Sequence, residues 1–177
     1  MDLVKTRRRG AELEEALLDA AWAELEEVGY PAFSYDGVAA RAGTSKPVLY
    51  RRWPGRQELL VATLRHLREV TPVDVPDTGN LRDDALAFLF EAKAKRVRII
   101  TLMSLELHAY FRETGSSFPE LRAQVRGPAA ASALDLIVQR AVARGEIAEV
   151  ARPARVVNLP FDLFRQEVIL TGGNVTD

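Results

Sequence analysis

Cysteine is absent from this sequence of 177 residues, and histidine occurs only twice. The absence of cysteine excludes disulfide frameworks, CxxC zinc sites and thiol nucleophiles. The two histidines, His66 and His108, lie far apart in the sequence, so a site built from paired imidazoles is not indicated. Strand-type alternation of apolar and polar residues is also missing, and the predicted fold class is therefore all-α.

Long hydrophobic runs are absent too. The most apolar segments, residues 97–111 and 156–170, are interrupted by the polar side chains Thr101, Glu106, His108, Asp162, Arg165 and Glu167. Neither segment provides the roughly 20 apolar residues that a membrane-spanning helix needs. No apolar run follows the N-terminal charges, as a secretory signal would require. We expect a soluble, cytoplasmic protein with no membrane partner.

The common catalytic motifs are missing as well. The sequence contains no GxSxG, no HExxH, no Glu-x-x-His pair and no phosphate-binding glycine loop. Glu106 and His108 stand two residues apart, so on a helix they lie on different faces and do not share a metal or catalytic site. We expect no enzymatic activity, no metal and no cofactor. An all-α small-molecule-binding enzyme or carrier remains the alternative from another class.

What the sequence does have is an uneven order of charge. The 24 basic and 25 acidic residues nearly cancel, yet residues 11–36 hold eight acids and no base. Residues 37–56 hold no acid and five bases, which are Arg41, Lys46, Arg51, Arg52 and Arg56. A second basic block lies within residues 5–9. Such a block is either a solvated face or a surface for a polyanion, and its structural setting decides between the two.

Apolar periodicity predicts a chain of helices. The first four cover residues 11–29, 34–42, 44–53 and 55–70, and later ones cover 81–93, 97–112, 119–144 with a break at Gly127-Pro128, and 153–171. Ser34 and Thr44 are the expected N-caps of the second and third helices. With Thr44 as N-cap, Pro47 is the third helical residue, where its missing N–H costs little. The segment "TPVDVPDTGN", residues 71–80, reads as a linker.

The second and third predicted helices have the spacing of a helix-turn-helix. This motif needs a small residue on its first helix, a glycine in the turn and an apolar residue on its second helix. Ala39, Gly43 and Leu49 meet these needs, and Val38 and Trp53 extend the same core. If Leu49 and Trp53 face inward, the other faces of the second helix carry Ser45, Lys46, Val48, Arg51 and Arg52.

The stretch "FSYDGVAARAGTSKPVLYRRWPGRQELL" resembles the DNA-binding signature of the TetR family of bacterial transcriptional regulators. The resemblance implies a homodimer that binds a palindromic operator in double-stranded DNA and releases it when a small-molecule effector binds. The expected function is a repressor that responds to an apolar or amphipathic ligand, and a DNA-binding regulator without an effector is the alternative. The implied domains are a helix-turn-helix domain at 1–55, a connecting helix at 56–70 and a helical effector-binding and dimerisation domain at 80–177.

The resemblance also implies which residues approach DNA. The candidate contacts are Arg7, Arg8, Arg9, Ser34, Thr44, Ser45, Lys46, Pro47, Val48, Tyr50, Arg51, Arg52 and Arg56. Arg56 matches a phosphate contact, and the three N-terminal arginines belong to a basic arm whose alternative is a solvated tail. Arg52 stands where the family often has histidine. Because a guanidinium can bind guanine O6 and N7 together, we expect a half-site that contains guanine.

The remaining candidates lie in the predicted C-terminal domain. Its tentative effector pocket comprises Phe88, Met103, Leu107, His108, Phe111, Phe161 and Phe164, each of which is otherwise plain core. Its tentative dimer interface comprises Val157, Phe161, Phe164 and Val168, for which burial within one domain is the alternative. The family layout has a further helix after the position of Asp177, so the resemblance implies that this domain lacks its last helix here.

Overall fold

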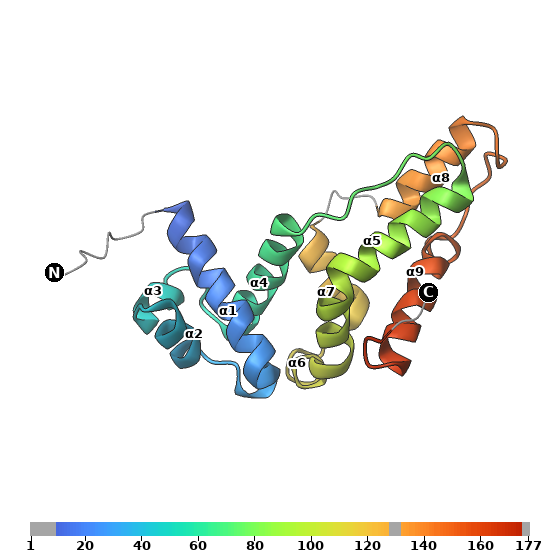
Figure 1. Ribbon diagram of the computed structural model, residues 1–177. Helices are drawn as coiled ribbons and strands as arrows, with labels where there is room; N and C mark the ends of the chain where they lie inside the picture. The colour runs from blue at the N-terminus through green and yellow to red at the C-terminus, as the bar shows by residue number, and fades with distance from the viewer. Residues whose placement is uncertain (1–9, 128–131, 175–177) are drawn as a thin grey trace. The chain divides into compact units, whose positions relative to one another are not determined.

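The computed structural model describes residues 10–127 and 132–174 (Figure 1). These residues contain nine α-helices and one π-helix and no strand, which confirms the predicted all-α class. They form two compact units. The first unit comprises the described residues up to Val70 together with Leu107–Val125, and the second comprises Thr71–Glu106 and the described residues from Arg126 onward. Residues 107–125, expected in the C-terminal domain, therefore group with the N-terminal helices.

Helix α1 (Ala11–Ala32) is the long helix of the first unit and presents one apolar stripe. Leu17, Ala21 and Leu25 recur every four residues and have no exposed surface. The helical backbone is interrupted at Gly29, whose φ of 67° glycine adopts without steric cost. The helix was predicted to end at this glycine, and only a short turn that contains Pro31 follows.

Helices α2 (Tyr35–Ala42), α3 (Lys46–Tyr50) and α4 (Arg56–Val70) complete the N-terminal part of the unit, with α1 packed against α2 and α4. Helix α3 differs from its prediction at both ends. Its N-cap is Ser45 rather than Thr44, so Pro47 is the second helical residue, where it still interrupts no intrahelical hydrogen bond. It ends at Tyr50, and the Trp53 N–H donates to the Leu49 carbonyl in the turn that follows.

Two short helices, α6 (His108–Thr114) and α7 (Phe118–Arg126), also belong to the first unit, α7 up to Val125. Leu107, Tyr110 and Leu121 are buried. The Tyr110 ring meets the Tyr30 ring edge to face, with 5.5 Å between centroids. Helix α6 is therefore packed against the C-terminal end of α1.

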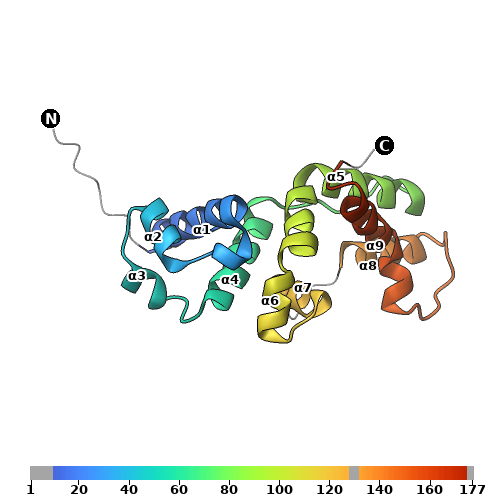
Figure 2. The same ribbon diagram turned by 90° about the horizontal axis from the view of Figure 1, so that it is seen from below.

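The second unit consists of α5 (Leu81–Thr101), a π-helix (Leu102–Glu106), α8 (Ala133–Ala143) and α9 (Ala154–Leu170). Figures 1 and 2 show α5, α8 and α9 side by side, and Phe88, Leu134 and Ile137 form the centre of their core. The predicted break between residues 93 and 97 is wrong. No glycine or proline stands there, and alanine and lysine are good helix formers, so α5 continues to Thr101.

A buried carboxylate fastens the linker to this unit. Asp84 has no exposed surface and accepts hydrogen bonds from the Thr78 N–H, the Thr78 hydroxyl and Arg144. Burial by itself would raise the pKa of Asp84, but these donors hold it below its ordinary value. The charge pair therefore ties the 71–80 segment to the start of α5 and to the end of α8.

Candidate nucleic-acid interface

The turn between α2 and α3 has the geometry that a helix-turn-helix requires. Gly43 adopts a left-handed conformation with φ of 64° and ψ of 39°. Its N–H donates to the Ala40 carbonyl, and the Thr44 N–H donates to the Ala39 carbonyl. These two bonds cap the end of α2, and a residue with a Cβ would be strained at position 43.

The orientation of α3 is set by two buried side chains. Leu49 has no exposed surface and Trp53 has 7%, and Val38 on α2 is also fully buried. Burying a leucine fully stabilises a fold by about 1.5–3 kcal/mol. Because rotation of α3 would expose Leu49, the side chains on its other faces are held toward solvent.

Tyr35 reinforces this arrangement, and the sequence did not indicate its role. Its hydroxyl donates a 2.6 Å hydrogen bond to the Trp53 carbonyl, and its ring stacks on Tyr50 with 4.1 Å between centroids. Burial, with smaller contributions from Tyr50 and Glu58, raises the pKa of Tyr35 to about 12. The aromatic pair joins the start of α2 to the end of α3. Tyr50, predicted as a DNA contact, is half exposed above Tyr35.

The structure brings most of the predicted contacts together on one segment. Ser45, Lys46, Pro47, Tyr50 and Arg51 are exposed, and Thr44, Val48 and Arg52 are half-buried. Lys46 pairs with Asp36 at 2.6 Å, and the Arg52 guanidinium donates to the Val48 carbonyl at 3.2 Å. Arg51 has no ion-pair partner among the described residues and is fully available to a polyanion. Their contact with DNA stays a prediction.

Not every cation of the basic block belongs to this surface. Arg41 pairs with the buried carboxylate of Glu24 at 3.0 Å and with Glu27 at 2.6 Å, both on α1. Gly37 makes room for this pair, because a Cβ at that position would clash with the Glu24 carboxylate. Arg41 therefore fixes α2 against α1.

Arg56 is also engaged within the fold. It is the first residue of α4, and its guanidinium lies 2.7 Å from each carboxylate oxygen of Glu113 on α6. Arg56 beside it holds the pKa of Glu113 below its ordinary value. The phosphate contact predicted for Arg56 stays a prediction, and no sequence pattern indicated Glu113 as its partner.

The other predicted DNA contacts lie outside this surface. Ser34 accepts a 3.2 Å hydrogen bond from the Gly37 N–H and so acts as the N-cap of α2. A hydroxyl engaged in this way still has a second lone pair for another donor. Arg7, Arg8 and Arg9 lie outside the residues that the structure describes.

Comparison with known proteins shows to which family this chain belongs. The family model described as bacterial regulatory proteins, tetR family, matches residues 17–63, which include α2, the turn and α3. The model described as tetracyclin repressor-like, C-terminal domain, matches residues 75–177, more than half of the chain. The chain belongs to the TetR family.

Individual relatives agree with this assignment. The DNA-binding transcriptional repressor TetR of Mycobacteroides abscessus is 33% identical over 138 residues, 78% of this chain and 72% of that protein. An uncharacterised HTH-type transcriptional regulator of Mycobacterium tuberculosis is 45% identical over 74 residues, 41% of this chain and 36% of its own length. The fatty acid degradation regulator FadR of Bacillus halodurans shares the fold, with a TM-score of 0.69 at 12% identity over 96% and 90% of the two chains. This TetR-family protein is thus a DNA-binding transcriptional regulator.

The predicted effector-pocket residues of this TetR-family regulator fall into two groups. Leu107, His108 and Phe111 lie in the first unit, where His108 is exposed. Phe88, Met103, Phe161 and Phe164 lie in the second unit. There Phe161 is 6.3 Å from Phe88 and 6.0 Å from Phe164 between ring centroids. The prediction of a pocket is supported only by this aromatic cluster of α5 and α9, and it stays a prediction.

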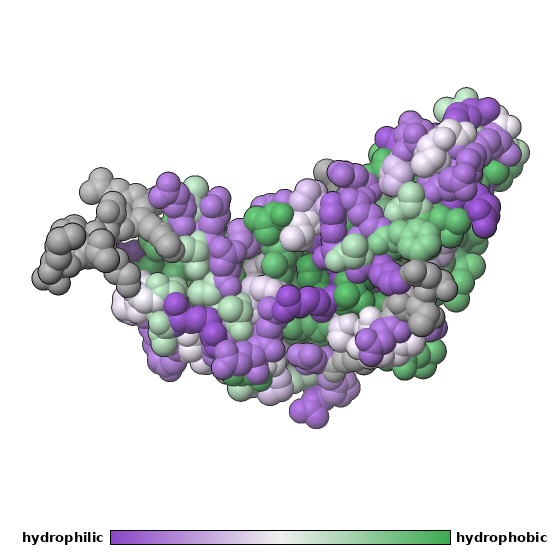
Figure 3. Space-filling model, viewed as in Figure 1, coloured by the Kyte–Doolittle hydropathy of each residue, from purple (hydrophilic) through white to green (hydrophobic). Residues whose placement is uncertain are grey.

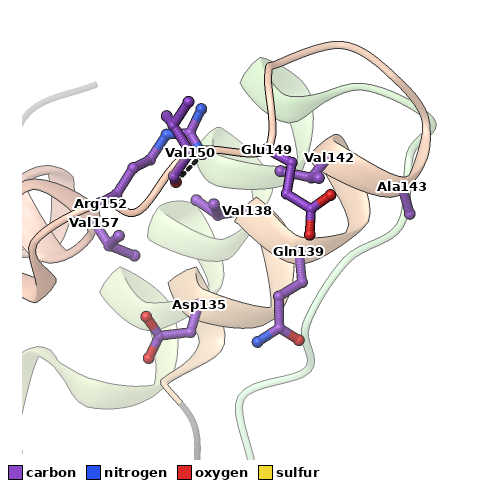
Figure 4. Close-up of a pocket in the computed structure, with 9 residues that line it drawn as sticks. All are labelled: Asp135, Val138, Gln139, Val142, Ala143, Glu149, Val150, Arg152 and Val157. Atoms are coloured by element: carbon purple, nitrogen blue, oxygen red, sulfur yellow. Dashed lines mark hydrogen bonds between the residues drawn. The ribbon is translucent and has the colours of Figure 1, made fainter.

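A groove of about 710 Å³ lies elsewhere in the second unit (Figure 4). It is open to solvent and is lined by Asp135, Val138, Gln139, Val142 and Ala143 of α8, by Glu149, Val150 and Arg152, and by Val157 of α9. Val157 belongs to the predicted dimer interface, and no lining residue belongs to the predicted effector pocket. Sequence periodicity could not indicate this groove, because the segment between α8 and α9 forms one wall.

Part of the predicted dimer interface lies inside the second unit. Val168 has no exposed surface, and Val157 and Phe161 pack against the core around Phe88. Val168 therefore offers no surface to a second copy. The exposed apolar side chains of α9 are instead Val156, Leu159, Leu163 and Leu170, which are 50–71% exposed. Hydrophobic residues also gather around α9 on the face seen in Figure 3.

Neither a membrane-spanning helix nor a metal site is found in the part of the chain that the structure describes. Among residues 10–127 and 132–174, no helix is long and apolar enough to cross a membrane. The same residues contain no group of three or more acidic or histidine side chains placed to hold a metal ion. The described residues offer a polar surface around α3 and apolar surfaces in the second unit.

Proposed function

We propose that this regulator is a homodimeric repressor that binds a palindromic operator through α3. The observation that carries the proposal is the exposed surface of residues 45–51, whose orientation Leu49, Trp53 and Tyr35 fix from behind. A recognition helix reads base edges mainly with its N-terminal residues, while cations and hydroxyls bind phosphates. Ser45 and Lys46 stand at the start of α3, where a hydroxyl and a cation suit such contacts.

Arg51 and Arg52 supply two further contacts in this proposal. Arg51 is exposed and suits a phosphate. Among the described residues, Arg52 donates through one guanidinium nitrogen to the Val48 carbonyl, so its other donors could bind guanine O6 and N7. The operator half-site is then expected to contain guanine, and binding should weaken steeply with salt as counterions are released.

The second copy is proposed to dock on the exposed side of α9. Two recognition helices must lie about 34 Å apart to enter successive major grooves, so the two protomers need a rigid junction. An apolar stripe with helical spacing is formed by Val156, Leu159, Leu163 and Leu170, which are exposed in the described part of the chain. A stripe of this kind is stabilised when a second apolar helix buries it.

The effector is proposed to be apolar or amphipathic and to bind at the aromatic cluster of α5 and α9. Phe161 lies beside Phe88, and Phe164 lies beside Phe161. Because Phe161 and Phe164 are half-buried, a ligand can contact their rings without first opening a fully buried core. Ligand pockets are typically lined by such aromatic residues with few polar groups. The proposal includes loss of operator affinity when the ligand binds.

Selection of duplexes from a random pool tests the DNA-binding part directly. The expected result is enrichment of an inverted repeat whose half-sites contain guanine, with half-site centres one helical turn apart. Footprinting at the enriched site with the Arg52→Ala variant should lose protection at the guanine. Enrichment of no sequence, or a salt-independent affinity, would contradict the proposal.

A further inference from the structure

Arg56 lies at the centre of a cluster that joins α1, α4 and α6. Its guanidinium contacts both oxygens of Glu113 at 2.7 Å and lies 4.4 Å from the centre of the Tyr30 ring. The Tyr30 hydroxyl donates to the same Glu113 carboxylate at 3.1 Å. The guanidinium also points at the Tyr30 and Phe33 carbonyls at 3.4 Å. In this cluster the cation Arg56 is therefore paired with Glu113, an acid on α6.

Arg56 follows the proposed DNA-binding segment closely in the sequence. Arg56 begins α4 directly after the turn that follows Arg51 and Arg52, and helix N-termini favour anions. Its side chain is 30% exposed and that of Glu113 is 43% exposed, so the pair is at the surface. Both contacts to Glu113 are made by Nη2 of Arg56, so a phosphate that binds at Nη2 has to displace Glu113.

We propose that Glu113 is an intramolecular competitor for DNA phosphate at Arg56. With α6 docked on α1, Glu113 keeps Arg56 from the nucleic acid. Displacement of Glu113 adds one cation to the DNA-facing surface and so raises the affinity for DNA. The proposal rests on DNA binding through α3 and gives the contact between α6 and α4 a regulatory role.

The expected size of the effect follows from the position of the pair. Exposed ion pairs stabilise by about 0–1 kcal/mol, so the competition should change affinity by no more than about five-fold. Each phosphate neutralised in B-DNA steepens the dependence of log affinity on log salt by about 0.9. Release of Arg56 should therefore steepen this slope by about one phosphate.

The test measures affinity for the duplex that the unaltered protein enriches from a random pool, over a salt series. Glu113→Gln keeps the shape of the side chain and removes its charge, and we expect two- to five-fold tighter binding and the steeper slope. Glu69→Gln is the matched control, because Glu69 is an exposed acid at the other end of α4 and its neutralisation adds the same net charge. The double variant Glu113→Gln with Arg56→Ala should lose the whole gain.

Other outcomes overturn the proposal. Glu113→Gln that binds no more tightly than the unaltered protein would show that Arg56 does not bind phosphate. An equal gain in Glu69→Gln, or a gain kept in the double variant, would show a general effect of charge. If Glu113→Gln melts at a lower temperature, Glu113→Asp serves as the second variant. It keeps the charge but shortens the reach of the carboxylate, and we expect a gain in DNA affinity smaller than that of Glu113→Gln. Failure of the unaltered protein to enrich any duplex would instead refute DNA binding itself.

Discussion

Helices α3 and α9 use their apolar residues in opposite ways. In and after α3, Leu49 and Trp53 are buried and the exposed positions are mostly polar or charged. In α9, Val168 is fully buried, yet Leu163 is 62% and Leu170 is 71% exposed on other faces. The first helix therefore buries its apolar side chains within the chain, whereas the second leaves part of its apolar surface exposed to solvent.

The difference matches the two kinds of partner that we propose. A polar surface on a rigid helix suits a phosphate backbone and base edges, where orientation decides the hydrogen bonds. An exposed apolar stripe suits another apolar surface, because removing it from water is favourable without strict geometry. The predictions below separate these two roles, from the largest expected effect to the smallest.

Substitution of Leu163 by glutamate tests the role of α9. A charge in the middle of the stripe should prevent dimerisation, and operator affinity should fall by about 10²–10⁴-fold because the second half-site no longer binds intramolecularly. Sedimentation velocity gives the oligomeric state and fluorescence anisotropy gives the affinity. Leu86→Glu, at an exposed leucine of α5, is the control and should remain a dimer. A dimeric Leu163→Glu variant would refute the assignment of this face.

Truncation of Leu49 to alanine tests the buried side of α3. A fully buried leucine in a well-packed core contributes about 2–5 kcal/mol, so the free energy of unfolding should fall by that amount. Chemical denaturation followed by circular dichroism measures it. Val48→Ala on the half-buried side should cost much less. Similar costs for the two variants would contradict the inward orientation of Leu49.

Arg51→Ala tests the outward side of the same segment. Arg51 is exposed and pairs with no acid among the described residues, so its removal should leave the melting temperature unchanged. Operator affinity should fall by about 10- to 100-fold, the range for loss of a good contact to DNA. Arg82→Ala, an exposed arginine of α5, should change neither quantity. An Arg51→Ala variant with full affinity would remove Arg51 from the interface.

The helix-turn-helix could be predicted from the sequence because its requirements are local. A small residue, a glycine with positive φ and an apolar residue must recur at fixed short spacings, and Ala39, Gly43 and Leu49 do. The end of α3 was less predictable. Helical spacing allowed Trp53 to continue the helix, but the chain turns after Tyr50 and still buries the Trp53 ring.

Contacts between distant parts of the sequence could not be predicted in this way. Arg56 and Glu113 are separated by 57 positions, and nothing in the charge pattern singles out Glu113 among 25 acids. The same limit applies to α9, whose apolar residues cover more than one face. Only the packing of α5 and α8 decides that Val168 is buried and Leu163 is exposed.

Tyr35→Phe should give the smallest effect. Loss of the hydrogen bond to the Trp53 carbonyl should reduce the free energy of unfolding near neutral pH by about 0.5–1.5 kcal/mol. The pKa of Tyr35 is raised from 10.0 to about 12 in the fold, so the unfolded chain loses this proton first. Its contribution is therefore complete below about pH 10 and is lost as the pH rises toward 12.

Denaturation at several alkaline pH values separates this contribution from others. Tyr30, whose pKa burial also raises to about 12, titrates in the same range and remains in the Tyr35→Phe variant. Stability of this variant should thus still fall between pH 10 and 12, but less steeply than in the unaltered protein. Tyr30→Phe should remove a further share of the slope, and Tyr110, whose pKa burial also raises, remains in both variants. Equal slopes in Tyr35→Phe and the unaltered protein would mean that the Tyr35 hydroxyl is not buried against Trp53, and the support of α3 would then rest on the burial of Leu49 and Trp53.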